Sequence, residues 1–289
     1  AFAERMRFGP FLLFSVLWAT FVYNPLAHWI WGGGWLAQLG VLDFAGGIAV
    51  HLSSGVAALA AAIILGKRKG YGSEELKPHN LTMTLLGAGL LWFGWFGFNA
   101  GSALAAGSIA GSAFVATHIG GTTGALAWIA MEWKLMGKAT TLGAASGAIA
   151  GLATVTPASG YVGPLSAAII GILAGIGCYL GIMAKNRFGY DDSLDVVGIH
   201  GVGGVIGLLC TGFLASKAVN PGGADGLLFG NPSQLGLQCI AVAVTIVYSF
   251  VISYILLQIV DKISGLRVTE TDEIGGLDLS QHDETAYNI

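Results

Sequence analysis

Residues 44–65 of this chain read FAGGIAVHLSSGVAALAAAIIL, a run of 22 residues without a single Asp, Glu, Lys or Arg. An α-helix needs about 20 mostly apolar residues to cross the hydrocarbon core of a bilayer. We therefore predict a membrane-spanning helix over these residues. One side chain in the run, His51, can ionise, and an imidazole at membrane depth is costly enough to indicate a functional role.

The rest of the chain has the same apolar character. Of its 289 residues, 54% are hydrophobic and 10% are charged, whereas soluble domains carry about 25% charged residues. This composition predicts an all-α polytopic membrane protein and excludes a soluble enzyme, and the net charge of −3 gives no reason to expect nucleic-acid binding. No nucleophile–base set or metal-ligand cluster is evident, so we expect neither an enzyme nor a cofactor. We interpret Cys178, Cys210 and Cys239, all within apolar segments, as packing residues.

Eight segments are apolar and long enough to be predicted as membrane helices. An even number of crossings places both termini on the same side as three of the loops, and that side holds twelve of the thirteen Lys and Arg residues. Only Lys217 falls on the opposite side. Because Lys and Arg collect in cytoplasmic loops, we expect both termini to be cytoplasmic. The predicted segments are 9–30, 44–65, 81–99, 109–133, 140–156, 164–184, 196–215 and 235–260.

Glycines four positions apart recur in these segments. Small residues at this spacing let membrane helices approach closely, and we expect them to pack helices within the chain. The pairs and runs are Gly97-xxx-Gly101, Gly143-xxx-Gly147-xxx-Gly151, Gly171-xxx-Gly175 and Gly203-xxx-Gly207.

Two histidines have mirrored surroundings. His51 follows Asp43 on a segment that runs inwards, whereas His200 follows Asp195 on a segment that runs outwards, and we expect each aspartate to cap the start of its helix. Opposed helices with matching starts are typical of an inverted repeat. At 1.5 Å per residue the two rings enter the membrane by roughly 12 Å and 7.5 Å, which leaves them roughly 10 Å apart in depth in a core about 30 Å thick. Aspartates slightly below the membrane surface would close this gap, so the sequence permits an imidazole pair. The alternative for each is a packed, hydrogen-bonded helix residue. We interpret Asp191 and Asp192 as solvated loop charges.

Several stretches along the whole chain resemble the ammonium transporter family, which includes the Amt, methylammonium permease and Rhesus proteins, and they match its Amt branch. They follow one another in the family's order. The matching stretches are Ala27-His28 to Trp31-Gly34, Leu42-Asp43 to Gly47 with His51, Lys77 to Leu81, Gly94 to Ser102, Gly147 to Leu152, Val155 to Ala158, Asp195 to Gly204, and Gly265 to Val268.

The resemblance implies a fold of eleven membrane helices in a homotrimer, with a pore through each subunit and an inverted repeat. The eight predicted segments resemble the last eight helices, so we expect the first three to be absent. The resemblance further implies a transmembrane transporter domain at 1–263 and a cytoplasmic regulatory tail at 264–289. This tail, which carries six Asp and Glu residues, is expected to be either a solvated end or a docking surface.

The same resemblance assigns roles to six residues. His51 and His200 would be the twin histidines that line the pore and relay a proton. Phe98 would be a gate ring, and Trp31, Ser102 and Asp43 would form or organise an outer site that recruits ammonium. From position alone, Asp43 is a helix N-cap and Trp31 an interfacial aromatic. We interpret Trp95 as a packing residue.

The resemblance implies transport of ammonium in a cell membrane, in which the cation is deprotonated and passes the pore as ammonia. It also implies a PII-type nitrogen regulatory protein as a partner at the cytoplasmic face. Two alternatives remain open. One is an ammonium sensor that signals through its tail, and the other is a Rhesus-type channel for uncharged gas.

Overall fold

Eight helical passes run through the part of the chain that the structure describes, and each coincides with one of the predicted segments. The computed structural model describes residues 1–285 and 287. Six passes are long and apolar enough to cross a membrane, and the other two are the 29-residue α6 and the 15-residue α7. The predicted all-α membrane fold is therefore confirmed. In chain order the passes are α1 (Phe8–Trp18), η1 (Ala19–Tyr23) and α2 (Asn24–Trp31); η2 (Gly47–Leu52) and α4 (Ser53–Leu65); α5 (Leu81–Gly101); α6 (Ser108–Met136); α7 (Thr141–Val155); α8 (Pro164–Phe188); η3 (Val197–Gly201) and α9 (Val202–Leu214); and α10 (Pro232–Ser264).

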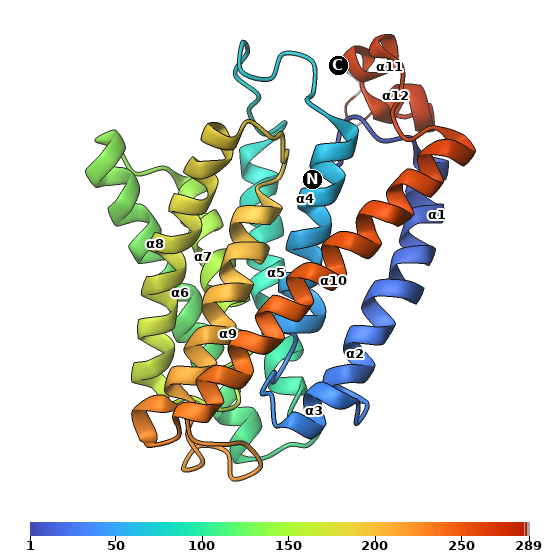
Figure 1. The fold of residues 1–289 in the computed structure, drawn as a ribbon. Helices are drawn as coiled ribbons and strands as arrows, with labels where there is room; N and C mark the ends of the chain where they lie inside the picture. The colour runs from blue at the N-terminus through green and yellow to red at the C-terminus, as the bar shows by residue number, and fades with distance from the viewer. Residues whose placement is uncertain (286, 288–289) are drawn as a thin grey trace.

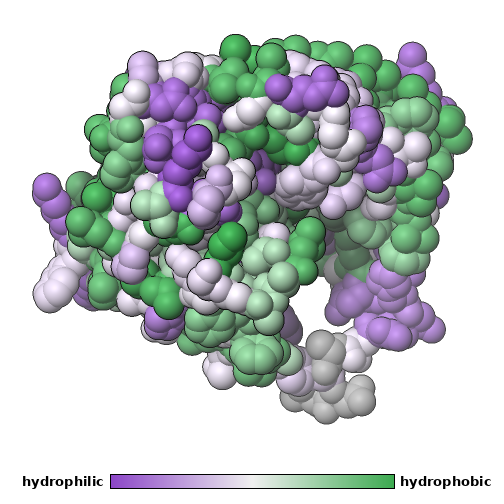
Figure 2. Space-filling model, turned by 90° about the horizontal axis from the view of Figure 1, so that it is seen from below, coloured by the Kyte–Doolittle hydropathy of each residue, from purple (hydrophilic) through white to green (hydrophobic). Residues whose placement is uncertain are grey.

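The helices run up and down through one bundle, and the 33-residue α10 crosses it diagonally (Figure 1). The N-terminus and residues 270–282 lie at one end, together with the loop 66–80 and the segment 189–196; we call this the basic end. The opposite end carries α3 (Trp35–Leu39) and η4 (Leu227–Phe229). Seen end-on, hydrophobic side chains reach the outline on several sides, as expected of a surface that faces lipid (Figure 2).

Most of the predicted glycine contacts are present. In α6, α7 and α8, helix backbones approach so closely that a Cβ on Gly147 would lie 2.8 Å from the carbonyl oxygen of Gly124, and one on Gly175 would lie 2.6 Å from the same oxygen. The prediction was wrong for Gly97 and Gly101, because a Cβ on either would meet no atom within 4 Å. These two glycines face away from the rest of the chain, and they do not pack its helices together.

The acidic tail folds back onto the basic end in two short helices, α11 (Glu270–Gly275) and α12 (Leu277–His282). Thr269 accepts a hydrogen bond from the backbone N–H of Asp272 and so caps α11. Glu273 pairs with Arg267 at 2.8 Å and accepts a hydrogen bond from the backbone N–H of Lys69 at 2.8 Å. Arg267 also donates to the carbonyl oxygens of Leu65 and Lys67, so the tail holds the loop that follows α4.

Candidate functional site

The two predicted histidines meet inside the bundle. The Nδ1 atoms of His51 and His200 are 3.1 Å apart, and the rings are stacked with centroids 5.2 Å apart at 25°. At this distance one nitrogen donates a hydrogen bond and the other accepts it. His51 is only 3% exposed, and its Nε2 has no hydrogen-bond partner among the described residues.

Each histidine lies on a π-helical turn. His51 belongs to η2 and His200 to η3, and an α-helix continues directly from each turn. Such turns occur mostly as single bulges inside α-helices and often mark functional sites. The matching placement supports the inverted repeat that the sequence predicts.

Asp43 holds the start of the first histidine helix. Its carboxylate accepts hydrogen bonds from the backbone N–H groups of Gly46 at 2.9 Å, Gly47 at 2.6 Å and Ile48 at 2.7 Å. Gly46 has a φ of 129°, a conformation that L side chains rarely adopt, and this turn brings the three N–H groups towards the carboxylate. Three of the free N–H groups at the helix start are thus satisfied by one side chain.

The start of the second histidine helix differs from the prediction. Asp195 does not cap it with its side chain, because that carboxylate pairs with Lys185. Asp192 does so instead and accepts a hydrogen bond from the backbone N–H of Val197 at 2.7 Å. The carbonyl oxygen of Asp195 accepts from Ile199 at 2.9 Å.

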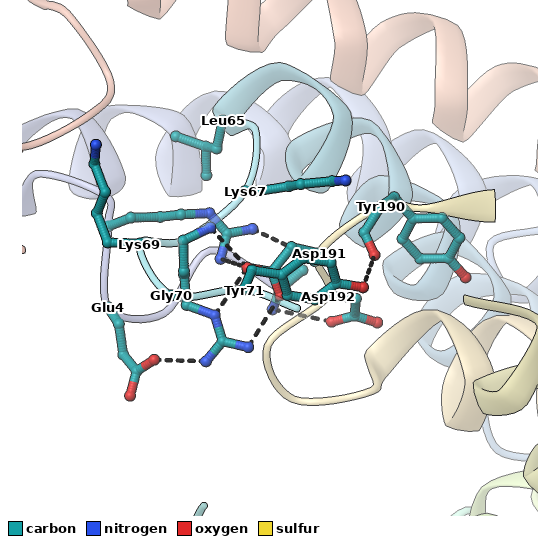
Figure 3. Close-up of polar contacts among 12 residues, drawn as sticks. Glu4, Leu65, Lys67, Lys69, Gly70, Tyr71, Tyr190, Asp191 and Asp192 are labelled. Carbon is teal, nitrogen blue, oxygen red and sulfur yellow. Dashed lines mark hydrogen bonds and ion pairs between the residues drawn. The ribbon is translucent and has the colours of Figure 1, made fainter. Parts of the chain in front are cut away.

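Asp191 and Asp192 are fully buried, so their interpretation as solvated loop charges was wrong. The carboxylate of Asp191 accepts three hydrogen bonds from Arg68. The donors are the side-chain Nε at 2.9 Å, the side-chain Nη2 at 3.0 Å and the backbone N–H at 2.8 Å. Arg68 also pairs with Glu4 at 2.6 Å, and Arg5 donates to the Asp191 carbonyl oxygen. Figure 3 shows the polar contacts around Asp191 and Asp192.

This network changes the acidity of Asp191. Burial raises the pKa of its carboxyl, but the hydrogen bonds from Arg68 and the charge of Arg5 outweigh burial, so the pKa lies below its ordinary value of 3.8. One feature of the sequence could have suggested a partner for Asp191. The basic residues at 67–69 and Arg5 are all predicted on the same side of the membrane as Asp191.

Aromatic rings lie on the His51 side of the pair. The ring of Phe98 is 6.1 Å from that of His51. Trp95 stacks on His51 at 5.4 Å and 24°, and its Nε1 donates to Thr156 Oγ1 at 3.0 Å. Trp95 is therefore a packing residue, as predicted, but the residue it packs against is one of the two histidines. Nothing in the sequence indicates this contact.

Trp31 lies near Asp43 and is 44% exposed. Its Nε1 donates to the Asp43 carbonyl oxygen at 2.9 Å, which leaves the ring face free. Ser102 Oγ donates to the carbonyl oxygen of Phe98 at 2.8 Å, so its lone pairs stay available to accept a hydrogen bond. Phe98 is 39% exposed. The structure thus groups Phe98 with the histidines and Trp31 with Asp43, and it ties Ser102 to Phe98.

Comparison with known proteins gives a consistent result. A profile described as the Ammonium Transporter Family matches residues 1–287. The chain is 54% identical over 288 residues to an ammonium transporter of Bacillus subtilis (strain 168), covering 99% of this chain and 71% of that protein. It is 53% identical over 287 residues to ammonium transporter Amt1 of Archaeoglobus fulgidus, covering 99% of this chain and 73% of that protein.

Solved structures agree in fold. The crystal structure of Saccharomyces cerevisiae Mep2 superposes with a TM-score of 0.86 at 39% identity, covering 91% of this chain and 61% of that one. A structure titled "Sensor Amt Protein" superposes with a TM-score of 0.88 at 31% identity, covering 98% of this chain and 72% of that one. The chain spans about three fifths of Mep2. From its sequence and its fold, this chain belongs to the ammonium transporter family.

Proposed function

We propose that this protein transports ammonium across a cell membrane, by recruiting the cation at an outer site and conducting it past the twin histidines as ammonia. The observation that carries the proposal is the contact of His51 and His200, with ring nitrogens 3.1 Å apart inside the helical bundle. The curated relatives named as ammonium transporters support it and do not favour the sensor alternative.

Recruitment would use the aromatic rings. A cation over an aromatic face gains about 0.5–2 kcal/mol, so Trp31 and Phe98 suit ammonium, and Ser102 can accept a hydrogen bond from it. Asp43 would organise this site, because its carboxylate accepts hydrogen bonds from the helix start and its carbonyl oxygen accepts one from Trp31 Nε1. Na⁺ or K⁺ would need several oxygen ligands to replace its water, and the apolar path offers few.

Deprotonation then provides selectivity. A bare charge in hydrocarbon is prohibitively costly, whereas neutral ammonia crosses far more easily. The hydrogen-bonded imidazoles His51 and His200 would accept the proton and relay it, because imidazole exchanges protons near neutral pH. A charged competitor such as K⁺ has no proton to lose and would stop at this step.

Uptake by cells without ammonium transporters of their own tests the proposal. Replacing His200 with Ala should abolish selective uptake or let K⁺ through. Rates should hold up at acidic external pH if the cation is recruited, whereas a Rhesus-type gas flux would fall with the ammonia fraction. Unchanged uptake and selectivity in His200→Ala would contradict the proton relay.

The assembly and its partner belong to the same proposal. The protein would be a homotrimer in the plasma or inner membrane, with residues 1–263 as the transporter domain and the tail, 264–289, in the cytoplasm. A cavity of about 840 Å³ is lined by residues of the loop 66–80 and of the tail and carries both charge signs, including Lys69, Glu270 and Asp278. This polar surface would suit a PII-type regulatory protein, and co-purification with and without the tail would test it.

A further inference from the structure

The two histidine helices touch each other at two backbone contacts, and each contact involves a glycine four residues after a histidine. Gly55 follows His51 and lies against Gly201, the residue after His200. Gly204 follows His200 and lies against Leu52, the residue after His51. The two contacts are therefore equivalent under exchange of the helices.

Neither glycine has room for a side chain. A Cβ on Gly55 would overlap the backbone N and Cα of Gly201 and lie 2.9 Å from the carbonyl carbon of His200. A Cβ on Gly204 would lie 2.8 Å from the backbone N of Leu52 and 3.0 Å from its Cα. The neighbouring atoms are backbone and cannot rotate away, so a methyl group at either position would push the two helices apart.

The space between the helices controls the imidazole pair because each glycine contact lies within four residues of a histidine. The ring nitrogens are 3.1 Å apart, and a hydrogen bond is lost beyond about 3.5 Å. A shift of a few tenths of an ångström between the helices is therefore enough to break it. We propose that Gly55 and Gly204 are positioning residues that set the separation of His51 and His200, an inference that rests on the proton relay proposed above.

The neighbouring glycines provide matched comparisons. A Cβ on Gly203, in the same helix as Gly204, would press on Thr154 Oγ1 at 2.8 Å and Cys178 Sγ at 3.3 Å, in α7 and α8. Its Ala variant would strain the bundle on the side away from the helix that carries His51. Gly236, in α10, has no atom within 4 Å of its Cβ position, so its Ala variant adds a methyl group in open space.

The experiment compares Gly55→Ala, Gly204→Ala, Gly203→Ala and Gly236→Ala by ammonium uptake per molecule of protein in the membrane. A misplacement of about 1 Å costs on the order of 100-fold in rate, so Gly55→Ala and Gly204→Ala should lose about that factor in maximum rate. The ammonium concentration that gives half of each variant's maximum rate should stay unchanged, because neither substitution alters the outer site. Gly236→Ala should match the wild type, and Gly203→Ala should lower the amount of protein but keep the rate per molecule.

A structure of Gly204→Ala, the milder change, measures the ring separation without any transport assay. We expect the Nδ1–Nδ1 distance to exceed about 3.5 Å. A wild-type distance, or wild-type rates per molecule in Gly55→Ala and Gly204→Ala, would overturn the inference. If the wild type does not transport ammonium, the proposed function fails instead, and the ring separation still decides whether these glycines position the pair.

Discussion

Arg68 and Asp191 join the ends of the two helices that carry the histidines. Arg68 lies in the loop just after α4, and Asp191 lies in the segment just before η3. The guanidinium donates to both carboxylate oxygens, at 2.9 and 3.0 Å, and the Asp191 side chain is fully buried. The pair therefore fixes the positions of both helices at the basic end, 17 residues after His51 on one side and nine residues before His200 on the other.

Replacing Asp191 with Ala should destabilise the protein strongly. The change leaves the guanidinium of Arg68 without its buried partner, and breaking a buried pair in this way costs about 3–5 kcal/mol. The free energy of unfolding in detergent measures the loss. The exposed pair of Glu75 and Lys77, with side chains 77% and 70% exposed, gives the control, and Glu75→Ala should stay within about 0.5 kcal/mol of wild type. Equal stabilities for the two variants would contradict the buried pair.

The contribution of Asp191 to stability should disappear in acid. Its folded-state pKa lies below the ordinary value of 3.8, so the unfolded chain binds its proton first as the pH falls. The stabilisation is complete above that ordinary value and is lost as the pH drops through the lower folded-state pKa. Melting temperatures of wild type and Asp191→Asn should therefore converge only below about pH 3.8. A difference that stays constant down to the lowest pH measured would show that the carboxylate charge is not responsible.

Asp43→Ala should weaken the start of the first histidine helix. It removes the acceptor of three backbone N–H groups, and loss of a helix cap costs about 0.5–2 kcal/mol. Asp43→Asn keeps one acceptor oxygen and should recover part of this stability. Thermal melting of the two variants measures the capping role of Asp43. Uptake at low ammonium concentration, measured on the same variants, reports on its role in recruitment. Identical melting of Asp43→Ala and wild type would rule out the capping role.

Phe98→Leu should raise the ammonium concentration needed for half-maximal uptake. Loss of a cation–aromatic contact of about 0.5–2 kcal/mol corresponds to roughly a two- to thirtyfold increase. Phe93 lies on the same helix and is 77% exposed, so Phe93→Leu should leave the uptake curve unchanged. A similar shift in both variants would indicate a general effect of changing α5 rather than a contact with the cation.

The sequence predicts the passes and the histidine pair well, for a physical reason. The hydrophobic thickness of a bilayer demands about 20 apolar residues for each crossing, so runs such as 44–65 are unambiguous. The mirrored settings of His51 and His200 also fix the depth of each ring to within a few residues. Both features depend on local sequence alone.

The partners of buried charges could not be predicted in the same way. Asp191 is 123 residues from Arg68 and 186 from Arg5, and nothing in a loop sequence specifies such pairing. The capping role of Asp192 was likewise assigned to Asp195, because two acidic residues near a helix start are equivalent in sequence. The π turns leave no trace in the hydropathy pattern, since one extra residue per turn barely alters the apolar period.

Each histidine turn holds one residue more than ordinary winding requires, and this has a consequence for how the chain tolerates length changes. Successive residues of an α-helix are rotated by about 100°. Deleting a single residue from η2 would therefore let regular winding resume between the Asp43 and Ser53 ends, and His51 would move by one position, a comparable angle, around the helix axis. The two helices that carry the histidines can accept a change of side chain, but the loss of a residue from either turn would move an imidazole away from its counterpart.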